Sequence, residues 1–147
     1  MKKLLFLSTR NSARSQIAEA LLRSKAPETY EAYSAGITPT ELNPLAVQVL
    51  QEVGIDISGH IAKDVAETFH TPFSFVITVC DRDEEKCPIY PLASRLHWSI
   101  SHPETLEEFR RVRDDLSKRI DSFLSGELIH DGDRSRFQQE SEALLKS

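Results

Sequence analysis

The sequence contains little of what marks several classes of protein. With two cysteines among 147 residues, it cannot be a small scaffold held together by disulfides. The net charge is -5, so nothing in the composition points to a nucleic-acid partner. No apolar run approaches the roughly 20 residues that cross a bilayer, and the run at residues 3–7 is too short for a signal peptide. We therefore expect a cytoplasmic protein that binds neither a membrane nor nucleic acid.

What is present is the composition of an ordinary globular domain. Hydrophobic residues make up 39% and charged residues 28% of the chain, and a chain of this length can bury one sizeable core. The residues nearest the C-terminus are polar and carry only a weak helical pattern. We expect one domain over residues 1–126 and a polar, partly helical extension over residues 127–147.

Two kinds of apolar pattern alternate along the domain. Short apolar runs predict strands at residues 3–7, 30–34, 73–80 and 94–98. Spacings of three and four predict helices at residues 15–25, 43–54, 62–69 and 103–126. In the second helix, Asn43 is the expected N-cap and Val53 is expected to face the core. The alternation predicts an α/β fold of three layers, in which helices flank both faces of a four-stranded parallel sheet.

The segment from Ser8 to Ser15 joins the first strand to the first helix. Backbone N–H groups converge at such a helix N-terminus, where the helix dipole also favours negative charge, and Arg14 adds a planar fork for two oxygens. The Gly-rich pattern of a nucleotide-binding loop is missing. The loop residues expected to bind a tetrahedral oxyanion are Ser8, Thr9, Arg10, Asn11, Ser12, Ala13, Arg14 and Ser15. The spacing alone equally allows a surface arginine and an ordinary N-cap at Ser15.

Ser8 and Cys80 each end a predicted strand. Ligands of open parallel sheets bind outside the carboxyl ends of the strands, so we expect both residues at that edge. Ser8 stands where a nucleophile aimed at the oxyanion would stand. Cys80 and Cys87 flank a polar segment and could form a redox pair, although a buried strand end and an incidental thiol fit the spacing as well.

Several motifs together resemble the low-molecular-weight protein tyrosine phosphatases and their relatives, the thioredoxin-coupled arsenate reductases. These motifs are LLFLSTRNSARSQIAEAL at 4–21, YSAG at 33–36, VGIDISGH at 53–60, VC at 79–80, CP at 87–88 and HW at 97–98. The family loop reads Cys-x5-Arg-Ser, which places Ser8 on the cysteine, Arg14 on the arginine and Ser15 on the serine. The resemblance covers residue 2 to about residue 123.

The cysteine pair distinguishes the two branches of this family, because the resemblance assigns such a pair to the reductases. It implies that the loop cysteine attacks arsenate, that Cys80 attacks the arsenic–cysteine adduct and that Cys87 resolves the resulting disulfide. Thioredoxin, or glutaredoxin in some relatives, then reduces the Cys80–Cys87 bond. Reduction of arsenate to arsenite, as in arsenical resistance, is therefore the expected activity, with no cofactor.

Ser8 departs from the family pattern, since a serine cannot enter a disulfide. We interpret it as a substitution introduced into such a reductase, which leaves the chain inactive. The alternatives are a tyrosine phosphatase and a natural relative that lost its nucleophile and binds oxyanions or phosphoproteins. Where the family carries an aspartate as general acid, this chain has His102, which can donate a proton near neutral pH or serve only as a helix-entry residue.

Lys63 is a third departure. Some reductases of this family bind potassium through positions that match Asn11, Glu19 and Ser34, together with an aspartate that Lys63 replaces here. An ammonium group beside Glu19 would take over the role of the ion, so we expect no bound potassium. The histidines show no metal-ligand spacing with the cysteines, so no zinc site is expected either.

Overall fold

A computed structural model describes residues 1–81, 90 and 93–131 of the chain. Cys87 and most of the expected C-terminal extension lie outside the described residues. The elements in chain order are β1 (Lys2–Ser8), α1 (Arg14–Lys25), β2 (Tyr30–Gly36), α2 (Pro44–Gln51), the 3-10 helix η1 (Val65–Thr68), β3 (Phe75–Cys80), β4 (Ser94–Ser99) and α3 (Leu106–Leu124).

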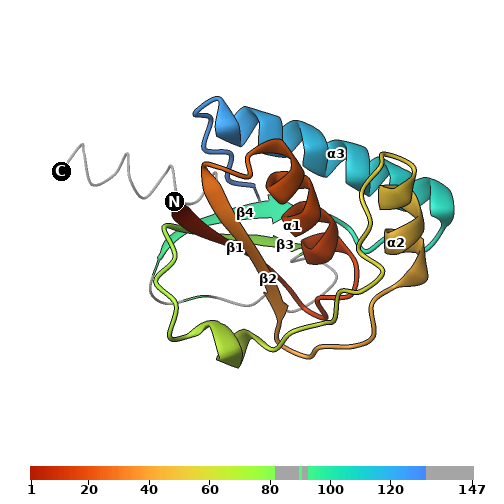
Figure 1. The fold of residues 1–147 in the computed structure, drawn as a ribbon, viewed down its shortest axis with the longest axis horizontal. Coiled ribbons are helices and arrows are strands. Elements are labelled where there is room, and N and C mark those ends of the chain that lie inside the picture. Colours follow the sequence, from red (N-terminus) through yellow and green to blue (C-terminus); the bar gives the residue numbers. More distant parts are fainter. Residues whose placement is uncertain (82–89, 91–92, 132–147) are drawn as a thin grey trace.

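The four strands form one parallel sheet in the order β2-β1-β3-β4 (Figure 1). This confirms the predicted four-stranded parallel sheet. Leu7 of β1 pairs with Thr78 of β3. Ser8 and Cys80, the last residues of these neighbouring strands, therefore lie at the same edge of the sheet, as the sequence predicted.

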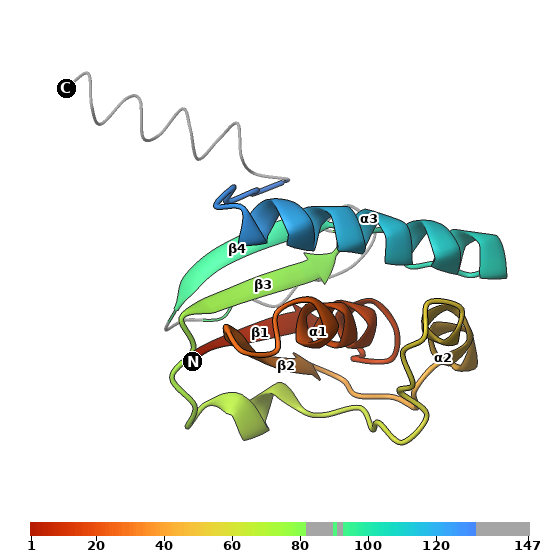
Figure 2. The same ribbon diagram turned by 45° about the horizontal axis from the view of Figure 1, so that its top comes forward.

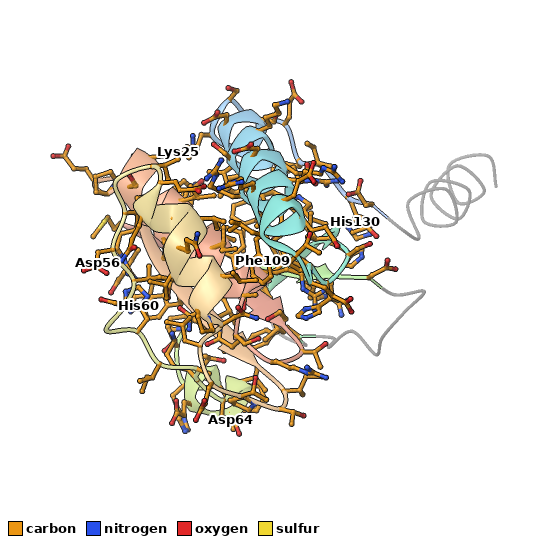
Figure 3. The ribbon with its side chains drawn as sticks, turned by 90° about the vertical axis from the view of Figure 1, so that its right-hand side faces the viewer. Lys25, Asp56, His60, Asp64, Phe109 and His130 are labelled. Atoms are coloured by element: carbon orange, nitrogen blue, oxygen red, sulfur yellow. The ribbon has the colours of Figure 1, made fainter. Side chains whose placement is uncertain are left out.

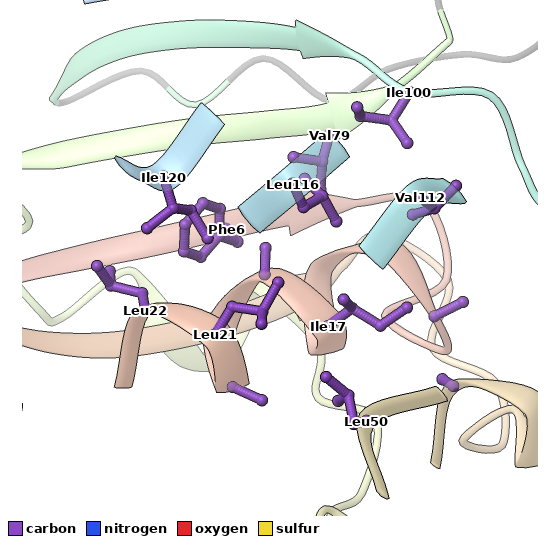
Figure 4. Packing of buried hydrophobic residues seen from close by; sticks show 14 of the residues in the cluster. Phe6, Ile17, Leu21, Leu22, Leu50, Val79, Ile100, Val112, Leu116 and Ile120 are labelled. Atoms are coloured by element: carbon purple, nitrogen blue, oxygen red, sulfur yellow. The ribbon is translucent and has the colours of Figure 1, made fainter. Parts of the chain in front are cut away.

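Residues of β1 alternate between two hydrophobic clusters, because successive side chains of a strand point to opposite faces. Leu4 and Phe6 join the larger cluster with α1, α2 and α3, and Figure 4 shows Phe6 between the sheet and Leu116 and Ile120 of α3. Leu5 and Leu7 join a smaller cluster on the other face, which also contains the buried aromatic residues Phe73 and Tyr90.

The three α-helices of the described residues thus pack on one face of the sheet. On the opposite face, Val65 of η1 packs against the smaller cluster, and in Figure 2 the strands of the sheet lie between η1 and α3. Within the described residues, no helix combines the length and apolar character that crossing a membrane requires.

Three expectations about helices need correction. Val53 was expected in the core, but α2 ends at Gln51 and Val53 is 49% exposed. The helix expected at residues 62–69 is only η1, capped by the Asp64 side chain. The last helix begins at Leu106 rather than Pro103, because the Thr105 hydroxyl accepts the Glu108 N–H and caps it there.

Residues just beyond the predicted domain boundary at 126 return to β4. The indole N–H of Trp98 donates to the Ile129 carbonyl at 3.0 Å, and the Asp131 N–H donates to the His97 carbonyl at 2.7 Å. Trp98 is fully buried and belongs to the larger hydrophobic cluster. These bonds tie the described start of the extension to the outer strand of the sheet.

Candidate oxyanion-binding site

The loop between β1 and α1 turns at Asn11, whose φ of 52° is in the left-handed region. The side chain of Asn11 fixes this conformation. Its amide nitrogen donates to the Ser15 hydroxyl at 2.8 Å, and its amide oxygen accepts from Gln16 Nε2 at 3.0 Å and from the Lys63 N–H at 2.9 Å. Asn11 is fully buried, so the loop is held from inside.

The end of β2 and the residues after it cover the outside of the loop. The N–H groups of Thr38, Thr40 and Asn43 donate to the carbonyls of Thr9, Arg10 and Ser12 at 2.8, 3.1 and 2.8 Å. A Cβ added at Gly36 would lie 2.8 Å from backbone atoms of Arg10 and Asn11. A glycine at position 36 is therefore what lets β2 approach the loop this closely.

Ser8 lies at the base of the loop and is 2% exposed. Its hydroxyl oxygen is 2.6 Å from that of Ser15, and it accepts the Asn11 N–H at 3.1 Å. Two groups that can donate hydrogen bonds thus converge on the Ser8 oxygen. The same donors would stabilise a negative charge on a sulfur at this position.

The loop encloses a cavity of about 240 Å³, whose lining residues are Ser8, Thr9, Arg10, Asn11, Ser12, Ala13, Arg14 and His102. Seven of the eight residues predicted to bind the oxyanion therefore share one cavity. Ser15 does not line it; its hydroxyl contacts Ser8 and Asn11 instead. The helix α1 starts directly behind, with Ala13 at its N-cap and no side-chain cap, so the positive end of the helix dipole faces this region.

Arg14 is 4% exposed and spans two parts of the site. It lines the cavity, and its Nη1 donates to the Ile100 carbonyl at 2.8 Å. This bond fixes the segment after β4 against the start of α1. His102, two residues further on, lines the cavity. The sequence had allowed His102 to be either a proton donor or only a helix-entry residue.

Cys80 is fully buried at the end of β3. Its carbonyl accepts the Ile100 N–H at 3.3 Å. The chain's other cysteine, Cys87, lies outside the described residues, so the predicted pair remains a prediction.

Glu19, on α1 behind the loop, is a buried carboxylate near the nitrogen atoms of three basic side chains. Its oxygens lie 3.5 Å from Arg23 Nη2, 3.8 Å from His60 Nδ1 and 3.9 Å from Lys63 Nζ. Figure 3 shows His60 on the segment that leads from α2 toward η1. The predicted proximity of the Lys63 ammonium to Glu19 is confirmed. Among the residues that the structure describes, no three acids, histidines or cysteines are placed to hold a metal.

Sequence reasoning missed Gln16, Ile100 and Asp81. Gln16 links Asn11 to the Ile61 carbonyl, Ile100 contributes only backbone atoms, and Asp81 accepts from Ser101. Gln16 shares its helix face with Glu19 and Arg23, so the pattern did not distinguish it from an ordinary polar residue. The other two contacts depend on how distant segments meet.

The comparisons with known proteins agree with this geometry. The family described as low molecular weight phosphotyrosine protein phosphatase matches residues 3–134. The chain is 36% identical over 125 residues to arsenate reductase 2 of Staphylococcus saprophyticus, covering 83% of this chain and 95% of that protein.

Solved structures from both branches share the fold. The thioredoxin-dependent arsenate reductase of Corynebacterium glutamicum superposes with a TM-score of 0.69 and 29% identity, over 85% of this chain and 61% of that one. The low molecular weight protein tyrosine phosphatase of T. tengcongensis gives a TM-score of 0.71 and 27% identity, over 85% and 99%. The chain therefore belongs to the low molecular weight phosphotyrosine protein phosphatase family.

Proposed function

We propose that this chain has the framework of an arsenate reductase whose first thiol is replaced by Ser8, so that it binds arsenate or phosphate without reducing it. The observation that carries the proposal is the position of Cys80. It ends the strand next to the one that Ser8 ends, at the edge where the oxyanion cavity opens. A phosphatase needs no thiol there, whereas a relay of thiols does.

The relay in the parent enzyme follows from the family resemblance. A thiolate at position 8 attacks arsenate, and an arsenic–sulfur bond forms as an oxygen leaves as water. The Cys80 thiolate then attacks that sulfur, so the arsenic–sulfur bond breaks, arsenic keeps the electron pair as arsenite, and a disulfide joins the two positions. Cys87 exchanges with this disulfide, and thioredoxin, or glutaredoxin, supplies two thiols to reduce the Cys80–Cys87 bond.

Side chains on the cavity and behind it have distinct roles in this proposal. Arg14 and the loop N–H groups bind the oxyanion, and Ser15 together with the Asn11 N–H stabilises the thiolate at position 8. With Ser8 in that place the donors and the cavity remain. A hydroxyl is far less acidic than a thiol and forms no disulfide, so the chain should stop at the bound oxyanion.

A phosphatase is the second candidate, because His102 lines the cavity. In that reaction the nucleophile at position 8 takes the phosphoryl group and His102 gives a proton to the leaving oxygen. A natural binding protein for oxyanions or phosphoproteins is the third candidate, and the retained loop and cavity are all that it requires.

Reversion of Ser8 to cysteine tests these alternatives. The Ser8→Cys variant is assayed for thioredoxin-dependent arsenate reduction and for hydrolysis of an aryl phosphate, with the unmodified chain as the matched control. We expect arsenate turnover that disappears when Cys80→Ser is added. Hydrolysis of the aryl phosphate that is indifferent to Cys80→Ser would assign the phosphatase instead, and the absence of both activities would favour the binding protein.

A further inference from the structure

The segment from Ile100 to His102 belongs to no helix or strand, yet it places His102 in the cavity wall. It leaves the end of β4, where Ser99 pairs with Cys80 of β3. Asp81 leaves the end of β3 beside it. Two chain segments that are about 20 residues apart in sequence therefore run side by side out of the sheet, next to the oxyanion cavity.

Hydrogen bonds hold this segment from both sides. On the side of α1, Arg14 Nη1 donates to the Ile100 carbonyl at 2.8 Å. On the side of β3, the Ser101 hydroxyl donates to Asp81 Oδ2 at 3.0 Å. A guanidinium carries five N–H donors, so Arg14 can keep Ile100 while it binds an oxyanion. Arg14 would then contact both the bound oxyanion and the segment from Ile100 to His102.

Asp81 fixes the other side. We propose that Asp81 is a positioning residue for His102: by accepting the Ser101 hydroxyl bond, it keeps the His102 ring at the oxyanion cavity. This inference rests on the proposed function only in that the cavity binds an oxyanion. Because Asp81 directly follows Cys80, the contact also links the segment that carries the proposed relay thiol to the segment that carries the proposed proton donor.

The test follows the ring of His102 by NMR while inorganic phosphate is added at fixed pH, with His102→Gln used to assign the signal. In the unmodified chain we expect a clear phosphate-induced shift of the His102 ring resonance. Asp81→Ala and Ser101→Ala should each reduce that shift at least twofold. Asp81→Asn should restore it, because the amide oxygen of asparagine still accepts a hydrogen bond. Glu127→Ala, an exposed acid away from the site, is the matched control.

Each outcome decides the proposal. A full shift in Asp81→Ala would overturn it, and so would an Asp81→Asn variant that behaves like Asp81→Ala, since the charge and not the bond would then matter. If Asp81→Ala does not fold, the phosphate-induced shift of the His102 ring in Ser101→Ala decides: a reduced shift supports the proposal, and a full shift overturns it. Loop resonances that do not respond to phosphate in the unmodified chain would contradict the proposed function, whereas loop resonances that respond while His102 stays unchanged would contradict only this inference.

Discussion

The hydroxyl oxygens of Ser8 and Ser15 lie 2.6 Å apart at the base of the loop, and both side chains are buried. Because either oxygen can be the donor, the Ser15 hydroxyl is free to turn its hydrogen toward an anion at position 8. The pair is therefore arranged for an ionised nucleophile, although the hydroxyl of Ser8 is a poor one.

A thiol introduced by Ser8→Cys should depend on Ser15 for its reactivity. A hydrogen bond to a charged group contributes about 1.5–3 kcal/mol, so adding Ser15→Ala should lower the ionisation constant of the thiol by about tenfold or more. The pH dependence of alkylation at position 8, followed by peptide mass spectrometry, measures this. Ser15→Thr retains a hydroxyl and is the control. Equal alkylation of the Ser15→Ala and Ser15→Thr forms would show that Ser15 does not stabilise the thiolate.

Gly36→Ala should disturb the oxyanion loop from outside. The new Cβ would meet backbone atoms of Arg10 and Asn11 at 2.8 Å, and backbone cannot move aside as a flexible side chain can. We expect a loss of about 1–3 kcal/mol of stability, as is typical of overpacking, together with a loss of phosphate affinity. Urea denaturation and calorimetric titration measure the two. Gly59→Ala, where nothing lies within 4 Å of the added Cβ, should change neither, and a Gly36→Ala variant with normal phosphate affinity would contradict the prediction.

Potassium should not stabilise this chain. The Lys63 ammonium already lies 3.9 Å from the buried Glu19 carboxylate, so a second cation would be repelled. The midpoint of thermal unfolding should be equal in potassium and sodium chloride of the same ionic strength. Lys63→Asp removes the ammonium and adds an oxygen ligand, so potassium should raise its midpoint, whereas Lys63→Ala should respond less. A potassium-dependent rise in the unmodified chain would refute the expectation.

Glu52 should contribute to stability only above acidic pH. Hydrogen bonds from Arg110, and then from Arg113, lower the pKa of Glu52 from 4.5 to about 2. A lowered pKa in the folded state gives stability that is present above the unfolded pKa and is lost as the pH falls toward the folded one. Glu52→Gln should therefore be less stable than the unmodified chain at pH 6, and the difference should shrink between about pH 4.5 and pH 2.

Urea denaturation of both proteins across this pH range checks the prediction. Glu127→Gln, which removes an exposed acid, serves as the matched control. A difference between Glu52→Gln and the unmodified chain that stays constant from pH 6 to pH 2 would show that the bonds of Glu52 to Arg110 and Arg113 do not depend on its charge.

The order of the elements could be predicted because each depends on neighbours in the sequence. A short apolar run predicts a buried strand, and apolar residues spaced three and four apart predict a helix with one apolar face. The first and last residues of the helices were harder to predict. Val53 follows the apolar pattern of α2 but lies beyond its last turn, and the hydroxyl of Thr105, rather than Pro103, decides where α3 begins. Side-chain caps and the apolar period can place the end of a helix at different residues. Only the folded backbone shows which of the two determines it.

The sequence by itself determined the loop between β1 and α1, the place of Arg14 in it, the serine at position 8 and the strand that ends in Cys80. Each is a short stretch of chain whose residue types already carry the chemistry. Only the tertiary structure decided that Gly36 covers the loop, that Arg14 reaches the Ile100 carbonyl and that Asp81 holds Ser101. These contacts join residues that are far apart in sequence, so they depend on strand order and register, which bring the segments together at one edge of the sheet.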